Sequence, residues 1–164
     1  RFIYPKDHKT LINSLCHLPP HIKLILVGTG ELLEKCQILV SKLKLQERVI
    51  FLGFRSDVPS LLKSSDIIVL STFYEGLSLS SMEALACGRP FIGTNVPGLK
   101  EVIQNAGLLF EVGDSSALAT HILKLLSDTS YYQQIASQCL LKSQNYSIEN
   151  MVLNHMKLYE VQVG

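Results

Sequence analysis

Residues 66–90, DIIVLSTFYEGLSLSSMEALACGRP, constrain the fold of this chain more than any other stretch. Residues 67–70 form an apolar run rich in β-branched side chains, which predicts a strand buried on both faces. Residues 71–76 predict a loop, and helix-forming residues follow from about Ser80 until Gly88 and a nearby proline supply a stop. Because ligands of an open parallel sheet bind at the carboxyl ends of its strands, the same stretch predicts a binding site.

Two carboxylates bracket this loop and the start of the helix. Glu75 stands beside Gly76, and glycine lets a backbone approach a ligand closely. Glu83 follows eight residues later, inside the first helical turns, where simple stabilisation of the helix dipole is the alternative interpretation. A helix start offers free backbone N–H groups to an anion, whereas carboxylates accept hydrogen bonds from hydroxyls. The combination indicates a ligand with both phosphates and hydroxyls, such as a nucleotide sugar.

The rest of the chain repeats the strand–helix alternation. Further strands are predicted at 22–27, 49–52, 91–93 and 108–110, and helices at 31–44, 98–104, 116–126, 131–142 and 148–161. Helix N-caps are expected at Asp7 or Thr10, for a helix through about Leu18, and at Asp57 and Asp114. In the last helix one face carries Met151, Val152, His155, Met156 and Tyr159. This alternation predicts an α/β fold: a Rossmann-like parallel sheet with helices on both faces, in one domain spanning 1–164.

Composition narrows the class of protein. With 164 residues, 47% hydrophobic and 18% charged, the chain is expected to be globular with a sizeable core. Its net charge of +1 gives no electrostatic footprint for nucleic acid, which is not expected as a partner. No apolar run reaches transmembrane length and no signal peptide is visible. Because the four cysteines lack C-x-x-C spacing, we expect buried free thiols in a reducing cytoplasm. The start at Arg1 suggests an excised domain.

The piece EGLSLSSMEALACGRP resembles the Glu-x7-Glu signature of retaining glycosyltransferases with the GT-B fold, in family 4 (glycosyltransferase group 1). RFIYPK, LILVGTGE, VIFLGF, DIIVLSTFYEG, MEALACGRPFI and GLLFEVGD match further pieces in order. The resemblance covers nearly the whole chain as that family's C-terminal, donor-binding domain, one half of a GT-B fold. Leu77 and Ser78 replace the Phe-Gly of many members, which bears on sugar preference. The resemblance also implies a strand immediately before Arg1; without it the sheet lacks a central strand, and the sequence leaves open what fills the gap.

The resemblance assigns roles to individual residues. It implies that Glu75 contacts the sugar ring and steadies positive charge at the anomeric carbon, as the catalytic carboxylate, and that Glu83 holds the ribose hydroxyls. Arg1 and Lys6 match the family's phosphate-contacting cations, with a solvated terminus as the alternative. The backbone amides implied to hold the diphosphate are those of Gly76, Leu77, Ser78 and Leu79.

Two further loops are weaker candidates for the donor site. Gly28 and Gly30 lack the third glycine of G-x-G-x-x-G, so a tight turn at a helix start is the alternative; in the family this loop borders the donor cleft. Gly53, Phe54 and Arg55 fall where family members meet the nucleotide base. Arg55 is a candidate to stack on that base, with a surface role as the alternative.

The sequence lacks the residue patterns of several metal sites and of a serine hydrolase. The five histidines show no metal-ligand spacing, no Asp-x-Asp occurs, and no Gly-x-Ser-x-Gly elbow is present. We therefore expect no cofactor and no metal.

The function expected is that of a retaining hexosyltransferase domain. It would bind a UDP- or GDP-sugar for transfer to an acceptor hydroxyl, as in polysaccharide, lipopolysaccharide or capsule biosynthesis. The sugar or lipid-linked acceptor would be bound by an N-terminal GT-B domain of the same protein, so the isolated chain would be inactive. The full-length protein is expected in the cytoplasm, or peripherally at the inner face of the membrane. Alternatives are a nucleotide-sugar binding or regulatory domain without transfer activity, and an epimerase-like enzyme of the same fold.

Overall fold

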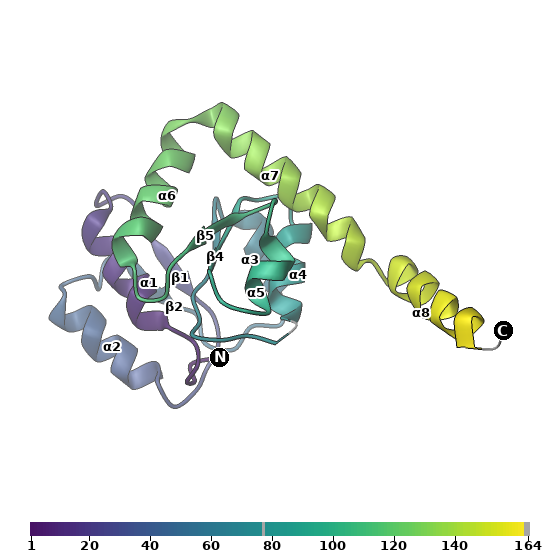
Figure 1. The fold of residues 1–164 in the computed structure, drawn as a ribbon. Helices are drawn as coiled ribbons and strands as arrows, with labels where there is room; N and C mark the ends of the chain where they lie inside the picture. The colour runs from purple at the N-terminus through teal and green to yellow at the C-terminus, as the bar shows by residue number, and fades with distance from the viewer. Residues whose placement is uncertain (77, 163–164) are drawn as a thin grey trace.

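The computed structural model describes residues 1–76 and 78–162, and it has the predicted alternation of parallel strands and helices (Figure 1). Five strands run parallel to their neighbours: β1 (Leu24–Leu26), β2 (Val49–Phe51), β3 (Ile68–Leu70), β4 (Phe91–Thr94) and β5 (Leu108–Phe110). In Figure 1, α1 and α6 lie to one side of the strands and α3 and α4 to the other. The α/β class predicted from the sequence is confirmed.

The helices follow the expected ranges closely. They are α1 (His8–Ser14), continued by the 3₁₀ turn η1 (Leu15–His17), then α2 (Leu33–Lys42), α3 (Val58–Ser64), α4 (Leu79–Ala86), α5 (Leu99–Ile103), α6 (Ser115–Ser127), α7 (Thr129–Ser143), the turn η2 (Gln144–Tyr146) and α8 (Ile148–Gln162). Asp7 accepts a hydrogen bond from the Thr10 N–H at 3.1 Å, and Asp114 accepts one from the Ala117 N–H at 2.8 Å, as expected of N-caps.

Asp57 occupies the predicted N-cap position of α3, but without the side-chain hydrogen bond expected of a cap. Asp57 does stand directly before α3, but its carboxylate accepts no hydrogen bond from the backbone of that helix. Instead it accepts two hydrogen bonds from Arg55, at 2.8 and 2.6 Å. The planar guanidinium offers a bidentate, charge-assisted partner two residues away, and this outcompetes the backbone N–H groups.

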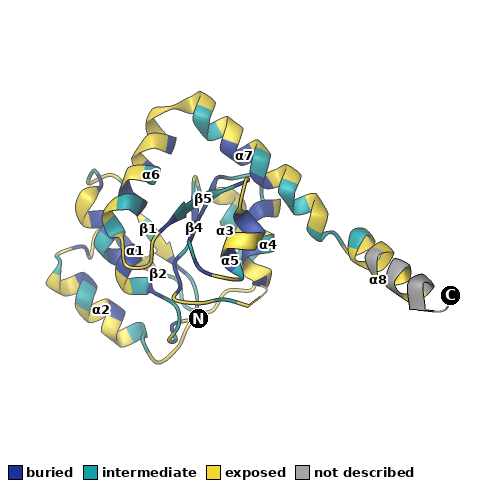
Figure 2. Ribbon diagram, in the orientation of Figure 1, coloured by how far each residue is buried: buried dark blue, intermediate teal, exposed yellow. Residues whose placement is uncertain are grey.

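The core lies around β4, the central strand of its sheet. All four residues of β4 are buried, and Phe91 and Ile92 are fully enclosed. Helices α5 and α7 pack against this strand, with the fully buried Leu99 and Cys139. Figure 2 shows the buried residues gathered on the inward sides of these elements. Burial on both faces is why these residues read as a continuous apolar run in the sequence.

The strands form two sheets where the sequence predicted one. β1 pairs with β2, and β3 pairs with β4 and β5 in the order β3-β4-β5. No ladder within the described residues joins β1 to β3; a cavity of about 830 Å³ lies between them. Paired strands lie about 4.8 Å apart, so β1 and β3, on opposite sides of this cavity, are too far apart to form a ladder.

The last helix, α8, extends away from the body of the domain (Figure 1). Its predicted apolar face is present but unpacked: Met151, Val152, Met156 and Tyr159 are all about half exposed or more. Among the described residues no helix combines the length and the apolar composition needed to span a bilayer.

Candidate functional site

The beginning of the chain crosses the carboxyl ends of the strands and ties the two sheets together. The Phe2 N–H donates to the Thr29 carbonyl at 2.9 Å, in the loop that follows β1. The Asp7 N–H donates to the Ser71 carbonyl at 3.1 Å, directly after β3, and Lys6 forms an isolated bridge with Thr72. This segment therefore places its cations where parallel-sheet proteins bind ligands.

Lys6 and Glu75, 69 residues apart in sequence, form an ion pair at this edge. The Lys6 ammonium donates to the Glu75 carboxylate, and the side chains are only 22% and 14% exposed. The sequence had placed both residues at one site without predicting that they pair. An ammonium and a carboxylate held side by side can meet both the phosphates and the hydroxyls of a ligand.

Arg1, Lys6 and Glu83 line the same 830 Å³ cavity. Arg1 enters from the chain start, and Glu83 from the exposed side of α4, one turn into the helix. Three of the four charged residues predicted for the donor site therefore line one cavity, and the fourth, Glu75, is paired with Lys6.

The start of α4 faces outward beside these residues. Ser78 occupies the N-cap in an extended conformation and is buried, but no side chain among the described residues caps the helix. Leu79, the first helical residue, is 72% exposed. A helix supplies no intrahelical partner for its leading backbone N–H groups, which can therefore meet an anion; in α4 the Ser81 N–H already donates to the Ser78 carbonyl at 3.1 Å. Gly76 precedes this turn and is exposed, whereas Leu77 lies outside the described residues.

The glycines of the loop after β1 are explained by the protein's own packing. Gly28 has φ +124° and donates its N–H to the Gly53 carbonyl at 2.7 Å. A Cβ on Gly30 would overlap the backbone of Phe2. The tight-turn interpretation therefore accounts for Gly28 and Gly30, and both glycines support the segment that carries Arg1.

Phe54 and Arg55 stand apart from the cavity. Phe54 is 81% exposed, and neither residue lines the cavity wall. Arg55 is held by Asp57, and this hydrogen bond keeps the pKa of the Asp57 carboxyl below its usual range. The geometry favours the surface alternative for Arg55.

A buried threonine pair, missed in the sequence, fixes the loop after β3. The Thr72 N–H donates to the Thr94 hydroxyl at 2.9 Å, and both side chains are fully buried. The Thr72 hydroxyl lies 2.9 Å from the Tyr74 carbonyl and 3.2 Å from the Pro5 carbonyl. These contacts bind the loop before Glu75 to the chain start. The sequence signal that could have revealed this pair is a polar residue at or directly after the end of a buried strand.

Gly98 supports the same loop from the other side. It has φ +83°, and a Cβ there would overlap the carbonyl oxygens of Glu75 and Gly76. The Glu101 side chain accepts a hydrogen bond from its N–H at 2.6 Å. The backbone of the loop can therefore approach this closely only because position 98 is a glycine, which has no Cβ. The dipeptide Pro97-Gly98 marks a turn in the sequence, but it carries no information about which backbone approaches it.

His8 also lies on the cavity wall, although the sequence did not single it out. Its ring stacks on Phe2 with the centroids 4.3 Å apart. Burial, opposed by a hydrogen bond with the Lys6 carbonyl, lowers the pKa of His8 below its ordinary value of 6.5. In residues 1–76 and 78–162 we find no group of three or more histidine, cysteine or carboxylate side chains that could hold a metal ion.

Comparison with known proteins places this site in context. The family described as "Glycosyl transferases group 1" matches residues 1–139. N-acetyl-alpha-D-glucosaminyl L-malate synthase of Bacillus anthracis is 42% identical over 120 residues, which are 71% of this chain and 31% of that protein. A putative glycosyltransferase, EpsD of Bacillus subtilis, is 34% identical over 125 residues, 73% of this chain and 33% of the relative.

Solved structures agree with the sequence comparison. The crystal structure of HepE from Anabaena in complex with UDP-glucose superposes with a TM-score of 0.89 at 29% identity, over 97% of this chain and 47% of that one. The chain spans about a third of the length of these curated relatives and just under half of that solved structure. Since the family match extends over most of the sequence, the chain belongs to the glycosyl transferases group 1 family.

Proposed function

We propose that this chain is the C-terminal, donor-binding domain of a retaining glycosyltransferase that moves a hexose-type sugar from a nucleoside diphosphate to an acceptor hydroxyl. The observation that carries the proposal is that Arg1, Lys6 and Glu83 line one cavity, while Lys6 pairs with Glu75 in the loop that leads to α4. Support comes from the likeness to HepE, whose structure was solved with UDP-glucose bound.

In the proposed complex the diphosphate lies at the start of α4. The N–H groups of the first turn, together with Arg1 and Lys6, surround it with positive charge. The same groups stabilise the negative charge that accumulates on the leaving diphosphate as the glycosidic bond breaks. Glu83, on the side of α4 that faces the cavity, accepts hydrogen bonds from the ribose hydroxyls.

Glu75 is proposed as the catalytic carboxylate. In the structure its charge is balanced by Lys6. When the diphosphate binds, Lys6 gains a second anionic partner, and Glu75 becomes available to the sugar ring. A carboxylate beside the anomeric carbon stabilises the positive charge that develops there in the transition state. This charge balance is why a lysine and a glutamate occupy one small site.

Metal independence is part of the proposal, because the cations at this site come from side chains and a helix start. The acceptor, a sugar or a lipid-linked sugar, is proposed to bind an N-terminal domain of the longer protein. We place the reaction in polysaccharide or lipopolysaccharide biosynthesis, in the cytoplasm or at the inner face of the membrane. Relatives named for such activities, for example O-antigen chain mannosyltransferase B of Escherichia coli, support the assignment to polysaccharide or lipopolysaccharide biosynthesis.

Calorimetric titration of the chain with UDP, GDP and UDP-glucose, each with excess chelator, tests the proposal. We expect saturable binding of one nucleoside diphosphate to a single site. The charge-swapped variant Lys6→Glu should abolish that binding, whereas Lys42→Glu, on α2 and remote from the cavity, should not. If neither diphosphate binds the folded chain, or if Lys6→Glu binds as tightly as the parent, the site is wrongly assigned.

A further inference from the structure

A second, smaller cavity of about 290 Å³ opens beside the donor site, between α1, α2 and the loop after β3. Its inner lining is apolar and comes from α2 and the residue before it, whereas its rim carries two exposed aromatic rings and two exposed ammonium groups. In that order these residues are Leu32, Cys36 and Leu39, then Tyr4 and Phe73, then Lys9 and Lys35. We call this space the aromatic hollow. An apolar concavity with a few polar groups is the usual form of a small-molecule site.

Three aromatic rings gather at the rim of the hollow. The Tyr4 and Phe73 rings are stacked with their centroids 5.6 Å apart, and the Tyr74 ring meets the Tyr4 ring edge-on at 6.4 Å. All three residues are at least 40% exposed. Single exposed apolar side chains are ordinary on a protein surface, but a contiguous group of them marks a place where a ligand or partner binds. The cluster therefore indicates a ligand that covers the faces of the rings.

The backbone that carries these rings is fixed. The Phe73 N–H donates to the Pro5 carbonyl at 2.9 Å, and Lys6 forms its bridge with Thr72. The Thr72 hydroxyl lies within hydrogen-bonding distance of both the Pro5 and the Tyr74 carbonyls. The two segments that hold the rings are thus bonded to one another through their backbones. A ligand that stacks on these rings does not have to order a loop, so less of its interaction energy is lost on binding.

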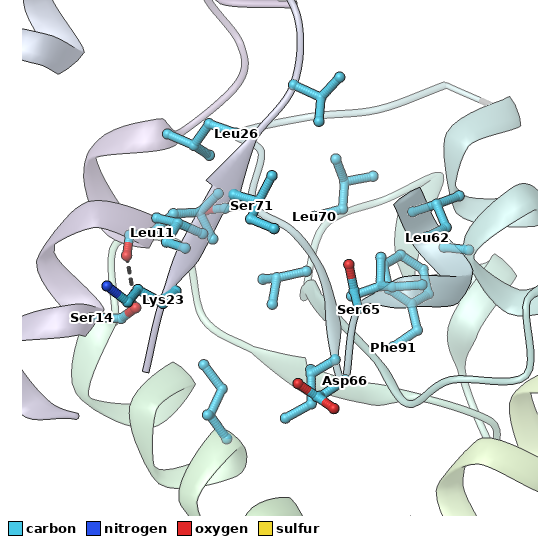
Figure 3. A pocket seen from close by; sticks show the side chains of 18 of the residues that line it. Leu11, Ser14, Lys23, Leu26, Leu62, Ser65, Asp66, Leu70, Ser71 and Phe91 are labelled. Atoms are coloured by element: carbon cyan, nitrogen blue, oxygen red, sulfur yellow. Dashed lines mark hydrogen bonds between the residues drawn. The ribbon is translucent and has the colours of Figure 1, made fainter. Parts of the chain in front are cut away.

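The hollow and the larger cavity are neighbouring compartments with a shared wall. Lys6 and His8 line both of them, whereas Arg1 and Glu83 line only the larger cavity. Figure 3 shows the interior of the larger cavity, and none of the residues labelled there lines the hollow. The two compartments meet at Lys6, which pairs with Glu75. A transfer between two substrates needs this arrangement, with one substrate on each side of the reacting groups.

We propose that the aromatic hollow is an acceptor subsite and that it binds a sugar ring of the acceptor. The inference rests on the proposed function, because it takes the nucleotide sugar to lie on the other side of Lys6. A ring seated on Tyr4 and Phe73 lies next to the loop that carries Glu75, so that one of its hydroxyls can face the donor sugar. The N-terminal domain proposed above would hold the rest of the acceptor.

The chemistry of the lining fits a sugar ring. A pyranose has an apolar face of C–H groups, which pack against the electron-rich face of an aromatic ring. Its edge carries hydroxyl oxygens, which accept hydrogen bonds from ammonium groups. Lys9 and Lys35 supply such donors, and within the described residues neither of them pairs with a carboxylate. One ligand therefore uses both the rings and the lysines of the hollow.

Chemical-shift titration of the isotope-labelled chain, saturated with UDP in the presence of chelator, tests the proposal. The probes are methyl α-D-glucopyranoside and methyl N-acetyl-α-D-glucosaminide, and the negative probe is sorbitol, which has the hydroxyls without the ring. We expect at least one glycoside to shift the amides of Tyr4, Phe73 and Lys35 saturably, with a dissociation constant of about 1–10 mM for a ligand of this size. Sorbitol should shift none of them.

Matched substitutions separate ring stacking from general apolar contact. Phe73→Leu keeps the apolar bulk but removes the flat ring, and it should weaken glycoside binding by about threefold to tenfold, as should Tyr4→Ala. Tyr159→Ala, at a tyrosine of α8 that is 66% exposed like Tyr4, should leave binding unchanged. Lys35→Met removes only the ammonium and should weaken binding by about threefold, whereas Lys42→Met, also on α2, should not. Melting temperatures within about 3 °C of the parent show that the variants are folded.

The outcomes distinguish this inference from the proposed function. A chain that binds UDP but shows no glycoside shifts at the hollow would overturn the inference and leave the proposed function standing. Glycoside shifts in a chain that binds no nucleotide would overturn the acceptor role, because no donor would lie beside the sugar. Undiminished binding by Phe73→Leu would show that the rings do not stack on a sugar. Shifts that depend on protein concentration, with a dimeric mass in sedimentation, would assign the rings to a second copy, and loss of the response in the longer protein would assign them to a contact with its N-terminal domain.

Discussion

Glu75→Gln separates the proposed catalytic role of this carboxylate from a structural one. The substitution keeps the shape of the side chain but removes its charge, and with it the ion pair to Lys6. An exposed pair contributes about 0.2–1 kcal/mol to folding. With side chains only 22% and 14% exposed, we place this pair at the upper end of that range, about 1 kcal/mol. The melting temperature should therefore fall by only about 2–4 °C.

Ligand binding should respond in the opposite direction. Once Glu75 is neutral, Lys6 no longer balances a carboxylate and interacts more strongly with a diphosphate. If the full 1 kcal/mol is released, affinity for UDP rises by up to about fivefold. Turnover by the longer protein should nevertheless fall by about 10²–10³, because charge at the anomeric carbon develops mainly in the transition state.

Three measurements on one variant decide the question: UDP affinity by calorimetry, melting temperature, and turnover. Glu47→Gln, in the exposed loop before β2, is the matched control and should leave all three unchanged. If Glu75 merely orders the loop before α4, affinity, stability and turnover will decline together. A parallel loss of all three would refute the catalytic assignment.

Three further predictions concern the loop, the half-buried His8 and metal-independent binding. Gly98→Ala places a Cβ against the Glu75–Gly76 backbone at φ +83° and should lower the free energy of unfolding, measured in urea, by at least about 3 kcal/mol. The control Gly88→Ala, at φ +71° in open space, should lower it by about 1–2 kcal/mol. Equal losses in the two variants would contradict the close approach of the loop to Gly98. Because burial lowers the folded pKa of His8, the unfolded chain binds this proton more readily; the contribution of neutral His8 to the free energy of unfolding is present above pH 6.5 and is lost as pH falls through the folded pKa. His8→Gln should therefore flatten the curve of unfolding free energy against pH below pH 6.5, whereas the exposed control His17→Gln should not. Excess chelator should leave the dissociation constant of UDP unchanged, and binding that required added magnesium or manganese would contradict metal independence.

The sequence predicted the local elements well because each carried its own signal. Examples are the apolar run of β3, the glycine after α4 and the carboxylates before α1 and α6. Each of these signals acts on residues only a few positions away, so hydrophobic periodicity and capping patterns detect it in the sequence. Asp57 occupies the predicted N-cap position, but its carboxylate accepts hydrogen bonds from a competing local partner, Arg55, in place of the helix backbone.

Contacts between distant segments could not be predicted in the same way. The pairing of Lys6 with Glu75 and the approach of Gly98 to the loop at Glu75 depend on how elements far apart in sequence meet. The division of the strands into two sheets is a property of the edges of β1 and β3, and each strand is locally normal. The exposed face of α8 shows the same limit, since an amphipathic pattern predicts a buried face without naming what covers it.

Glu83 offers the most direct test of the donor site, through a thermodynamic cycle between the carboxylate and the ribose. Affinities of UDP and of 2′,3′-dideoxy-UDP are measured by calorimetry for the parent chain and for Glu83→Gln. If Glu83 accepts the ribose hydroxyls, the variant should lose about 1.5–3 kcal/mol toward UDP, about 10- to 150-fold in the dissociation constant. Removing the hydroxyls should weaken binding to the parent by a similar amount and cause little further loss in the variant. An unchanged affinity of Glu83→Gln for UDP, or two losses that simply add, would contradict the account.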